Sequence, residues 1–411
     1  MESVVSNHIV DFLDSNKLIL ETQHGFRRKK SCVTNLLEFF NDMLLKYDKT
    51  KAIDIIYLDF KKAFDKVPHQ RLLAKIYALG IRGKVCKWIE DWLCNRKQRV
   101  VLNGFSSKWQ VVASGVPQGS VLGPILFITY LNDLDLNIIS TLSKLADDTK
   151  LGNVANNIDC IAALRSDLLK LEKWSTKWQM EFNLDKCNVM HIGCKNIHAT
   201  YHFLGSTLSC TNVEKDLGIL ISNDLKVTKQ CIIAEKKAMK ILGYIKWLFS
   251  YRDKNIIVPL YTSLVRPHLE YAVQFWSPDL RKDIKRLEKV QARATKLIPN
   301  IRNFSYEHRL DYLGMQSLEV RRLRFQLIQV YKIIHIIDKI DFDKFFTLSR
   351  NITRNNGYKL EAKRYHSSAN ERFFSNFVVN PWNSLSSKVV CSSSLASFKH
   401  NLDQELPRYF T

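Results

Sequence analysis

The chain has 411 residues, a formal net charge of +22 and 46% hydrophobic residues. This hydrophobic content excludes a disordered protein, and no apolar run reaches the roughly 18 residues that a membrane-spanning helix needs. Nine cysteines without a C-x-x-C pair argue against a disulfide framework. Without a secretory signal, we expect a nuclear or cytoplasmic protein that is not secreted. A chain this basic is expected to bind a polyanion, most simply a nucleic acid.

The first 50 residues combine two helical patterns with a basic cluster between them. Apolar residues recur at helical spacing over 4–20 and 32–47, while QHGFRRKKS at 23–31 contains Arg27 and Arg28 next to two lysines. Three interpretations of this cluster stay open: contact with the phosphates of a template or substrate, a nuclear-localisation patch, or a solvated loop.

The next segment predicts a buried strand that ends on a carboxylate. Residues 52–65 read AIDIIYLDFKKAFD, with a β-branched apolar run before Asp59. Because burying an unpaired carboxylate costs free energy, we expect a cation beside Asp59. A helical turn is expected from residue 61, two helices within 67–93, and a hairpin over 96–113 that turns at Asn103-Gly104.

A glycine- and proline-rich loop follows at 113–127, ASGVPQGSVLGPILF, and leads into a predicted helix at 121–131. Its glycines would let the backbone approach a nucleotide closely, and Gln118 offers both donors and acceptors there.

Residues 142–152, LSKLADDTKLG, predict a hairpin with Asp147 and Asp148 at or beside the turn. Alone, such a pair is usually a solvated turn. Together with Asp59, however, it gives three hard oxygen ligands of the kind that hold Mg²⁺ and substrate phosphates. Two such ions can activate an attacking hydroxyl and stabilise a leaving oxygen.

Three of these stretches resemble the motifs of reverse transcriptases from non-LTR retrotransposons (LINE, jockey-like). They are LDFKKAFD at 58–65, SGVPQGSVLGP at 114–124 and LADD at 145–148, in the family's order and at similar spacing. Leu145 departs from the family, which usually has Phe or Tyr there. The resemblance implies an RNA-directed DNA polymerase that joins a dNTP to a primer 3′-OH with two Mg²⁺ ions, with Mn²⁺ as an alternative.

The resemblance also implies individual roles. The catalytic residues would be Asp59, Asp147, Asp148 and Lys186, with the three aspartates as metal ligands. Lys186 would protonate the leaving pyrophosphate as a general acid, although an exposed lysine without a role is an equal alternative. The substrate-binding residues would be Phe60, Phe64, Gln118, Gly119, Arg27 and Arg28. Phe64 would select deoxynucleotides by clashing with a ribose 2′-hydroxyl.

After the acidic hairpin, the pattern predicts a long helix at 158–180, a strand within 182–193 and another strand at 213–221. A zinc site is a weaker alternative for the histidines and cysteines of this region, Cys187, His191, Cys194, His198 and His202. By resemblance, 213–221 belongs to a hairpin that grips the primer.

From Leu225 to Lys332 the chain has 22 lysines and arginines against 9 acidic residues, arranged in helical patterns. Basic helical faces with Trp247 and Tyr251 suit a nucleic-acid backbone channel with stacking surfaces, while Trp276 is expected in the core. The nucleic-acid-binding residues would be Lys236, Lys237, Lys240, Lys285, Arg286 and Lys289. By resemblance, this region is a thumb with a connector.

We therefore expect an α+β fold: a right-hand polymerase with an antiparallel-sheet palm, partial fingers, a helical thumb and a small C-terminal helical module. The expected divisions are partial fingers at 1–50, a palm at 51–223 with finger elements at 66–112, a thumb and connector at 224–337, and a linker with the C-terminal module at 338–411. The linker is expected at 338–358.

The expected partners are an RNA template, a DNA primer or target and dNTPs, with no membrane; the sequence does not predict the oligomeric state. The resemblance further implies a polymerase truncated at its N-terminus, since this family carries an endonuclease upstream. Two alternatives stay open: a truncated nucleic-acid-binding remnant without catalysis, and an RNA-templated RNA polymerase, which Phe64 disfavours.

Overall fold

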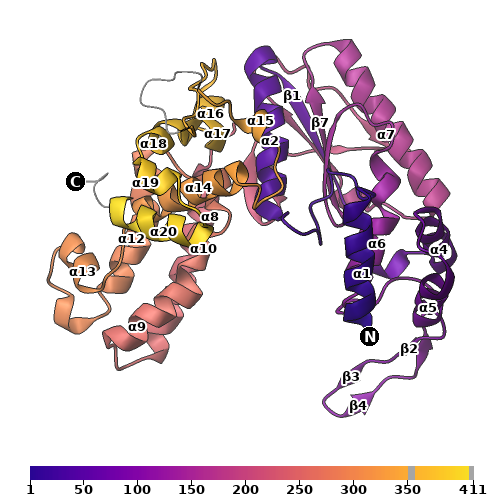
Figure 1. The fold of residues 1–411 in the computed structure, drawn as a ribbon, viewed down its shortest axis with the longest axis horizontal. Coiled ribbons are helices and arrows are strands. Elements are labelled where there is room, and N and C mark those ends of the chain that lie inside the picture. Colours follow the sequence, from indigo (N-terminus) through magenta and orange to yellow (C-terminus); the bar gives the residue numbers. More distant parts are fainter. Residues whose placement is uncertain (350–356, 407–411) are drawn as a thin grey trace. The chain divides into compact units, whose positions relative to one another are not determined.

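The computed structural model describes residues 1–349 and 357–406, and its chain forms two compact units (Figure 1). Unit 1 comprises Met1–Asn35 and Thr50–Thr211, and unit 2 comprises Leu36–Lys49 and the chain from Asn212 onward. Helix α2 (Cys32–Thr50) contributes to both. The four functional segments expected from the sequence therefore do not coincide with these units, and their assignment stays a prediction.

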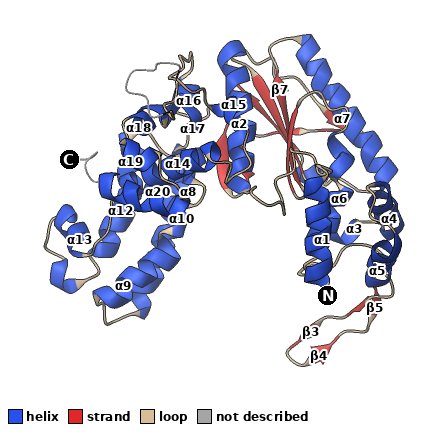
Figure 2. Cartoon of the chain, viewed as in Figure 1, coloured by secondary structure: helices blue, strands red, loops and turns tan. Residues whose placement is uncertain are grey.

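Unit 1 is built on a five-stranded sheet with the order β11-β8-β1-β7-β6. Figure 2 draws the strands in red. The central strand β1 has all six residues buried, which explains its continuous β-branched sequence. Pairing is antiparallel except between β11 and β8, so the expected antiparallel sheet carries one parallel edge pair. The strands are β1 (Ile53–Leu58), β6 (Thr141–Leu145), β7 (Asp148–Val154), β8 (Asn188–Ile192) and β11 (Ser209–Cys210).

Helix α7 (Ile158–Trp178) packs against this sheet and confirms the predicted long amphipathic helix. Its buried Leu164, Leu168 and Leu171 join a core that includes Ile56 and Val189 of the sheet. The other helical elements of unit 1 are α1 (Glu2–Ser15), α3 (Ala63–Lys66), α4 (His69–Ala78), α5 (Gly83–Leu93), α6 (Gly123–Tyr130), η1 (Asn132–Asp135) and η2 (Leu184–Lys186). Unit 1 also contains a short antiparallel strand pair, β9 (His202–Phe203) and β10 (Ser206–Thr207).

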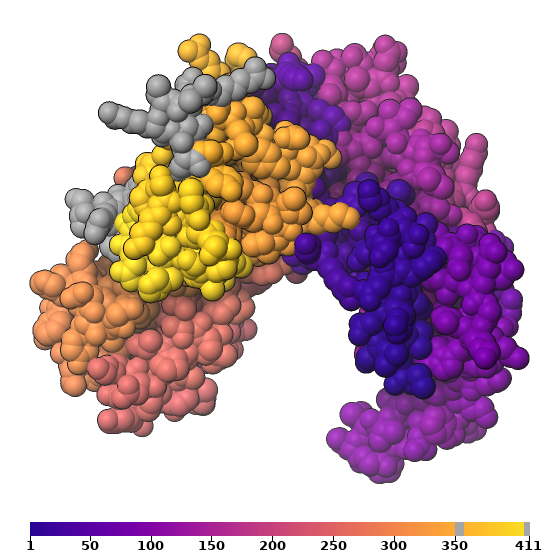
Figure 3. Space-filling model, in the orientation of Figure 1, coloured from indigo at the N-terminus to yellow at the C-terminus, as the bar shows by residue number. Residues whose placement is uncertain are grey.

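The predicted hairpin at 96–113 is confirmed and projects from the body of unit 1 (Figure 3). It consists of β2 (Lys97–Gln98), β3 (Val101–Leu102), β4 (Phe105–Ser106) and β5 (Gln110–Val111). Asn103 and Gly104 both adopt positive φ, 48° and 85°, as the tight turn between twisted strands requires.

Unit 2 is mostly helical. Its long helices are α8 (Thr228–Leu248), α12 (Arg281–Thr295) and α14 (Leu318–Ile334), and Trp276 is buried among its core residues as expected. The shorter elements are α9 (Lys254–Leu260), η3 (Tyr261–Val265), α10 (Pro267–Glu270), α11 (Val273–Trp276), η4 (Pro299–Ile301), α13 (Tyr306–Tyr312), α15 (Phe342–Phe345), α16 (Ser368–Glu371), α17 (Phe374–Phe377), α18 (Val379–Asn383), α19 (Ser387–Val390) and α20 (Leu395–Glu405).

Two predictions about unit 2 are wrong. The single strand expected at 213–221 is a hairpin of β12 (Val213–Asp216) and β13 (Ile219–Ser222), because Leu217 and Gly218 turn the chain with φ of 46° and 87°. The linker expected at 338–358 contains α15 and the buried Phe345 and Phe346; its residues 350–356 lie outside the described part.

Across the described ranges 1–349 and 357–406, no helix combines the length and apolarity needed to cross a bilayer.

Candidate active site

The two motif aspartates meet where the central strands end. Leu58 pairs with Thr149, so Asp59 leaves β1 beside the turn that joins β6 to β7. Asp147 lies in this turn and is half-buried, while Asp148 opens β7 opposite Leu145 and is exposed. The antiparallel register therefore brings Asp59 to the hairpin turn, although Asp59 and Asp147 are 88 positions apart in the sequence.

The electrostatics of this pair favour a cation. Burial raises the pKa of the Asp147 carboxyl, and the nearby charge of Asp59 raises it further. Two carboxylates that repel each other at a strand end gain stability from a positive charge between or beside them.

Lys186 supplies one such charge from outside the strand. Its Nζ lies 3.0 Å from Asp59 Oδ2, and the lysine side chain is otherwise mostly exposed. The hydrogen bond to Asp59 raises the pKa of the Lys186 ammonium, with weaker help from the charges of Asp147 and Asp148. The structure thus brings together Asp59, Asp147 and Lys186 from three separate sequence motifs.

The glycine-rich loop packs against the residues that follow β1 and Asp59 in the chain. A Cβ on Gly115 would lie 2.7 Å from the Asp65 backbone, and Gly115 has φ of +92°, so only glycine fits there. Val116 N–H donates to the Phe64 carbonyl at 2.7 Å, and Gln118 Nε2 donates to Asp65 Oδ1 at 3.1 Å. Asp65 therefore has a structural role: it holds the loop through its side chain and its backbone. Gly119 stays exposed.

The two phenylalanines of the first motif differ in their surroundings. Phe64 is half-buried and stacks on Phe127 with ring centroids 4.1 Å apart. Phe60 is buried and stacks on Phe182 at 4.2 Å, with its ring in the core of unit 1. The structure places Phe60 away from solvent, which makes it a packing residue beneath the site.

The two arginines of the basic cluster also differ. The side chain of Arg27 is only 5% exposed; it pairs with Asp14 at 3.4 Å and donates to the Leu20 carbonyl at 3.1 Å. Arg28 is exposed and pairs with Asp11. Arg27 therefore braces the N-terminal segment, and Arg28 is the better placed of the two to reach a phosphate.

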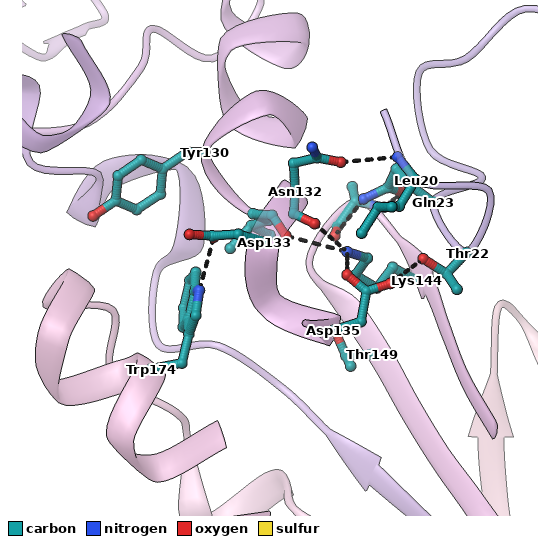
Figure 4. Close-up of polar contacts among 12 residues, drawn as sticks. Leu20, Thr22, Gln23, Tyr130, Asn132, Asp133, Asp135, Lys144, Thr149 and Trp174 are labelled. Atoms are coloured by element: carbon teal, nitrogen blue, oxygen red, sulfur yellow. Dashed lines mark hydrogen bonds and ion pairs between the residues drawn. The ribbon is translucent and has the colours of Figure 1, made fainter. Parts of the chain in front are cut away.

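A buried polar network behind the β6–β7 hairpin could not be expected from the sequence pattern (Figure 4). Lys144 Nζ is fully buried in β6, lies 2.7 Å from Asp135 Oδ1 and donates to the Leu131 carbonyl at 3.2 Å. Asp135 also accepts from the Thr22 hydroxyl. The only signal in the sequence was a lysine at a core position of the strand, because a buried ammonium group needs a partner of opposite charge.

The basic residues of unit 2 form two classes. Lys236, Lys237 and Lys240 on α8 are exposed, as are Lys285 and Lys289 on α12. Arg286 instead pairs with Glu235 at 2.8 Å and links the two helices. Trp247 and Tyr251 are 81% and 72% exposed, as a stacking surface requires.

Residues 1–245 match the family described as reverse transcriptase (RNA-dependent DNA polymerase). The chain belongs to the reverse transcriptase family. Its α+β architecture and its three motifs agree with this assignment, and the resemblance to non-LTR retrotransposon enzymes is confirmed by its relatives.

Two curated relatives illustrate this relationship. The RNA-directed DNA polymerase from mobile element jockey of Drosophila funebris is 27% identical over 314 residues, covering 72% of this chain and 34% of the relative. The probable RNA-directed DNA polymerase from transposon X-element of Drosophila melanogaster is 25% identical over 307 residues, with the same coverages. The chain thus spans about a third of the length of these relatives. Among solved structures, telomerase from Candida Tropicalis in complex with a telomeric RNA fragment has a TM-score of 0.45 at 12% identity, covering 98% of this chain and 56% of that one.

Reverse transcriptases generally use divalent metal ions, so the question is whether the residues of this site could bind one. Asp59 and Asp147 are hard oxygen donors with repelling charges, which suits a divalent cation shared with substrate phosphates. Within the described residues, no three His, Cys, Asp or Glu side chains converge as a metal-binding group. Asp148 is exposed at the start of β7. His191 of the zinc alternative pairs with the buried Asp54 at 2.7 Å.

Proposed function

We propose that this chain is the polymerase part of a non-LTR retrotransposon protein and copies an RNA template into DNA. The observation that carries the proposal is the convergence of Asp59, Asp147 and Lys186 at one end of the β1–β7 pair. These residues come from three distant segments, and each occupies a position that the family's motifs would assign to catalysis.

Asp59 and Asp147 would hold the divalent ions, with Asp148 assisting from its exposed place at the start of β7. We propose two ions, Mg²⁺ or Mn²⁺. When bound, such ions would lower the pKa of the primer 3′-hydroxyl and offset the charge of the triphosphate. The carboxylates act by position and charge, since phosphoryl transfer needs little covalent help from the protein.

Lys186 is proposed as the general acid. Its raised pKa keeps the side chain an ammonium at neutral pH, and its exposed position lets it swing from Asp59 to a bound triphosphate. It would pass one proton to the oxygen of the departing pyrophosphate and recover it from water.

Phe64, Gln118 and Gly119 would shape the nucleotide pocket. Phe64 is held by Phe127 and its carbonyl is held by the loop, so its ring has a fixed place beside the site. An apolar ring offers no hydrogen bond to a 2′-hydroxyl, which favours dNTPs over ribonucleotides. Gln118, bonded to Asp65, and exposed Gly119 would face the base and phosphates, with Arg28 reaching a phosphate oxygen.

The exposed lysines of α8 and α12 would bind the phosphate backbone of template and primer, and Trp247 and Tyr251 would stack on bases. This role needs no fixed partner for each lysine, because backbone binding depends on summed charge.

Primer extension on an RNA template with dNTPs and Mg²⁺ tests the proposal, with Asp147→Ala as the control. We expect extension by the natural chain, no extension by Asp147→Ala and poor use of ribonucleotides. A folded protein that binds RNA in a salt-sensitive manner but extends no primer would instead be a binding remnant.

A further inference from the structure

The side chain of Gln23 is buried against the turn that carries Asp147. It is 1% exposed, and its Oε1 accepts from Ala146 N–H at 2.9 Å and from Gly25 N–H at 2.7 Å. Its Nε2 lies 3.4 Å from the Ala146 carbonyl and donates to it. One amide therefore holds both backbone polar groups of the residue that precedes Asp147.

Ala146 needs such support because its backbone is in the left-handed region, with φ of +57°. A residue with a Cβ avoids this conformation unless its surroundings impose it. Only Gln and Asn side chains combine a carbonyl acceptor with an amide donor, and Gln is the longer of the two. The match between Gln23 and Ala146 is thus chemically specific.

The segment around Gln23 is pressed against the hairpin along its whole length. His24 N–H donates to the Lys144 carbonyl, and Lys144 N–H donates to the Thr22 carbonyl, both at 2.8 Å. A Cβ on Gly25 would lie 2.3 Å from the Ala146 nitrogen, so no larger residue fits this approach. Thr22 also bonds Asp135, the partner of Lys144, which ties the same segment to the network behind β6.

We infer that Gln23 is a positioning residue for the polymerase reaction: it holds Ala146 in the left-handed conformation and thereby aims the Asp147 carboxylate toward Asp59. It touches neither substrate nor metal and acts through the turn. The inference rests on the proposed function, because it gives Gln23 a role in the site that Asp147 would form.

Three variants separate positioning from general stability. Gln23→Met keeps a long unbranched side chain but removes both bonds to Ala146. Adding Ala146→Gly to Gln23→Met lowers the cost of the positive φ without restoring the bonds. Gln230→Met is the matched control: Gln230 is also a buried glutamine that holds a backbone N–H, that of Leu220 at 3.0 Å, but it lies in unit 2.

Two readouts apply to each variant, the single-turnover extension rate at saturating substrates and the affinity for Mn²⁺ by electron paramagnetic resonance. We expect Gln23→Met to lose about 10- to 100-fold in rate and about 10-fold in Mn²⁺ affinity, with primer–template affinity unchanged. Ala146→Gly should recover part of both losses, several-fold. Gln230→Met should lower only the melting temperature.

The inference is overturned if folded Gln23→Met binds Mn²⁺ and extends primers as the natural chain does while Asp147→Ala does neither. It is also overturned if Ala146→Gly recovers nothing. Should Gln23→Met not fold, Gln23→Asn carries the same comparison, because its amide is one methylene shorter. Absence of extension by the natural chain would refute the proposed function, and Mn²⁺ binding would still decide whether Gln23 positions Asp147.

Discussion

The two units present charge in opposite ways. At the end of β1, unit 1 fixes a few charges by specific contacts: Lys186 on Asp59, and Asp147 in a braced turn. On α8 and α12, unit 2 displays exposed lysines over helical faces. In the first arrangement we expect each residue to be individually necessary for catalysis. In the second we expect nucleic-acid affinity to depend on the summed charge of the surface. Mutations in the two units should therefore differ in size, in salt dependence and in the step that they affect.

The largest effect is expected from Asp59→Asn, which keeps the side-chain shape but removes the charge that meets Lys186 and Asp147. Primer extension should fall by more than about 100-fold, because the variant would lose one of the two carboxylates proposed to hold the divalent ions. Asp185→Asn, an exposed carboxylate next to Lys186 in the sequence, serves as the control and should extend normally. Equal loss in both variants would contradict the special place of Asp59.

Lys186→Met should lower the single-turnover rate by about 100-fold at neutral pH, as expected for loss of a general acid. The ammonium form is the acid, and the Asp59 contact raises its pKa, so activity of the natural chain should persist into alkaline pH and fall only as pH rises through that raised pKa. The variant should lack this alkaline fall.

Lys173→Met, an exposed lysine on α7, is the control for Lys186→Met and should keep both rate and pH profile. An unchanged profile in Lys186→Met would show that Lys186 moves no proton in the rate-limiting step.

Reversal of three charges in unit 2, Lys236, Lys237 and Lys240→Glu, should weaken RNA binding by about 10- to 100-fold. The slope of log affinity against log salt should become shallower by about 2 to 3, since each of the three lost phosphate contacts removes about 0.7 to 0.9. The control reverses Lys84, Lys87 and Lys173 in unit 1, with the same change in net charge. If both triple variants bind equally, net charge alone explains RNA binding.

The smallest expected effect is on the pH dependence of stability and concerns Lys75, a buried lysine in unit 1. Its Nζ donates to the Tyr130 carbonyl and lies 3.7 Å from the Trp178 ring centroid. Burial lowers its pKa to about 8, below the unfolded value of 10.5, although Asp133 partly offsets this. Between these two pH values the unfolded chain binds more protons, so this group makes the free energy of unfolding rise with pH.

The rise should be on the order of 1 kcal/mol per pH unit and absent in Lys75→Met. Urea unfolding of both proteins at pH 8 and pH 10 measures it. Parallel pH dependence in the two proteins would show that Lys75 does not titrate in this range.

The sequence alone predicted the parts of the site that follow local rules. Asp59 ends an apolar strand, Asp147 sits at a hairpin turn, and Asn103-Gly104 marks a tight turn, so each could be located from neighbouring residues. The antiparallel register brings Asp59 and Asp147 to the same end of the sheet, as the order of the motifs predicted.

What the sequence did not reveal depends on contacts between distant segments. Gln23 and Ala146 are 123 positions apart, and no periodicity connects them. The same holds for the salt bridge between Arg27 and Asp14. The run of basic residues does not show that the Arg27 side chain is shielded from solvent while that of Arg28 is exposed. The resemblance implied a hairpin at 213–221, but the turn inside this stretch was not located, although Gly218 gave a usable signal.

The most direct test of the account measures extension and RNA affinity on the same preparation of Asp59→Asn beside the natural chain. We expect the variant to bind the primer–template with unchanged affinity and salt dependence but to extend no primer. Retained extension would contradict the assignment of the site, and loss of RNA affinity together with extension would contradict the separation between the acidic site and the basic helices.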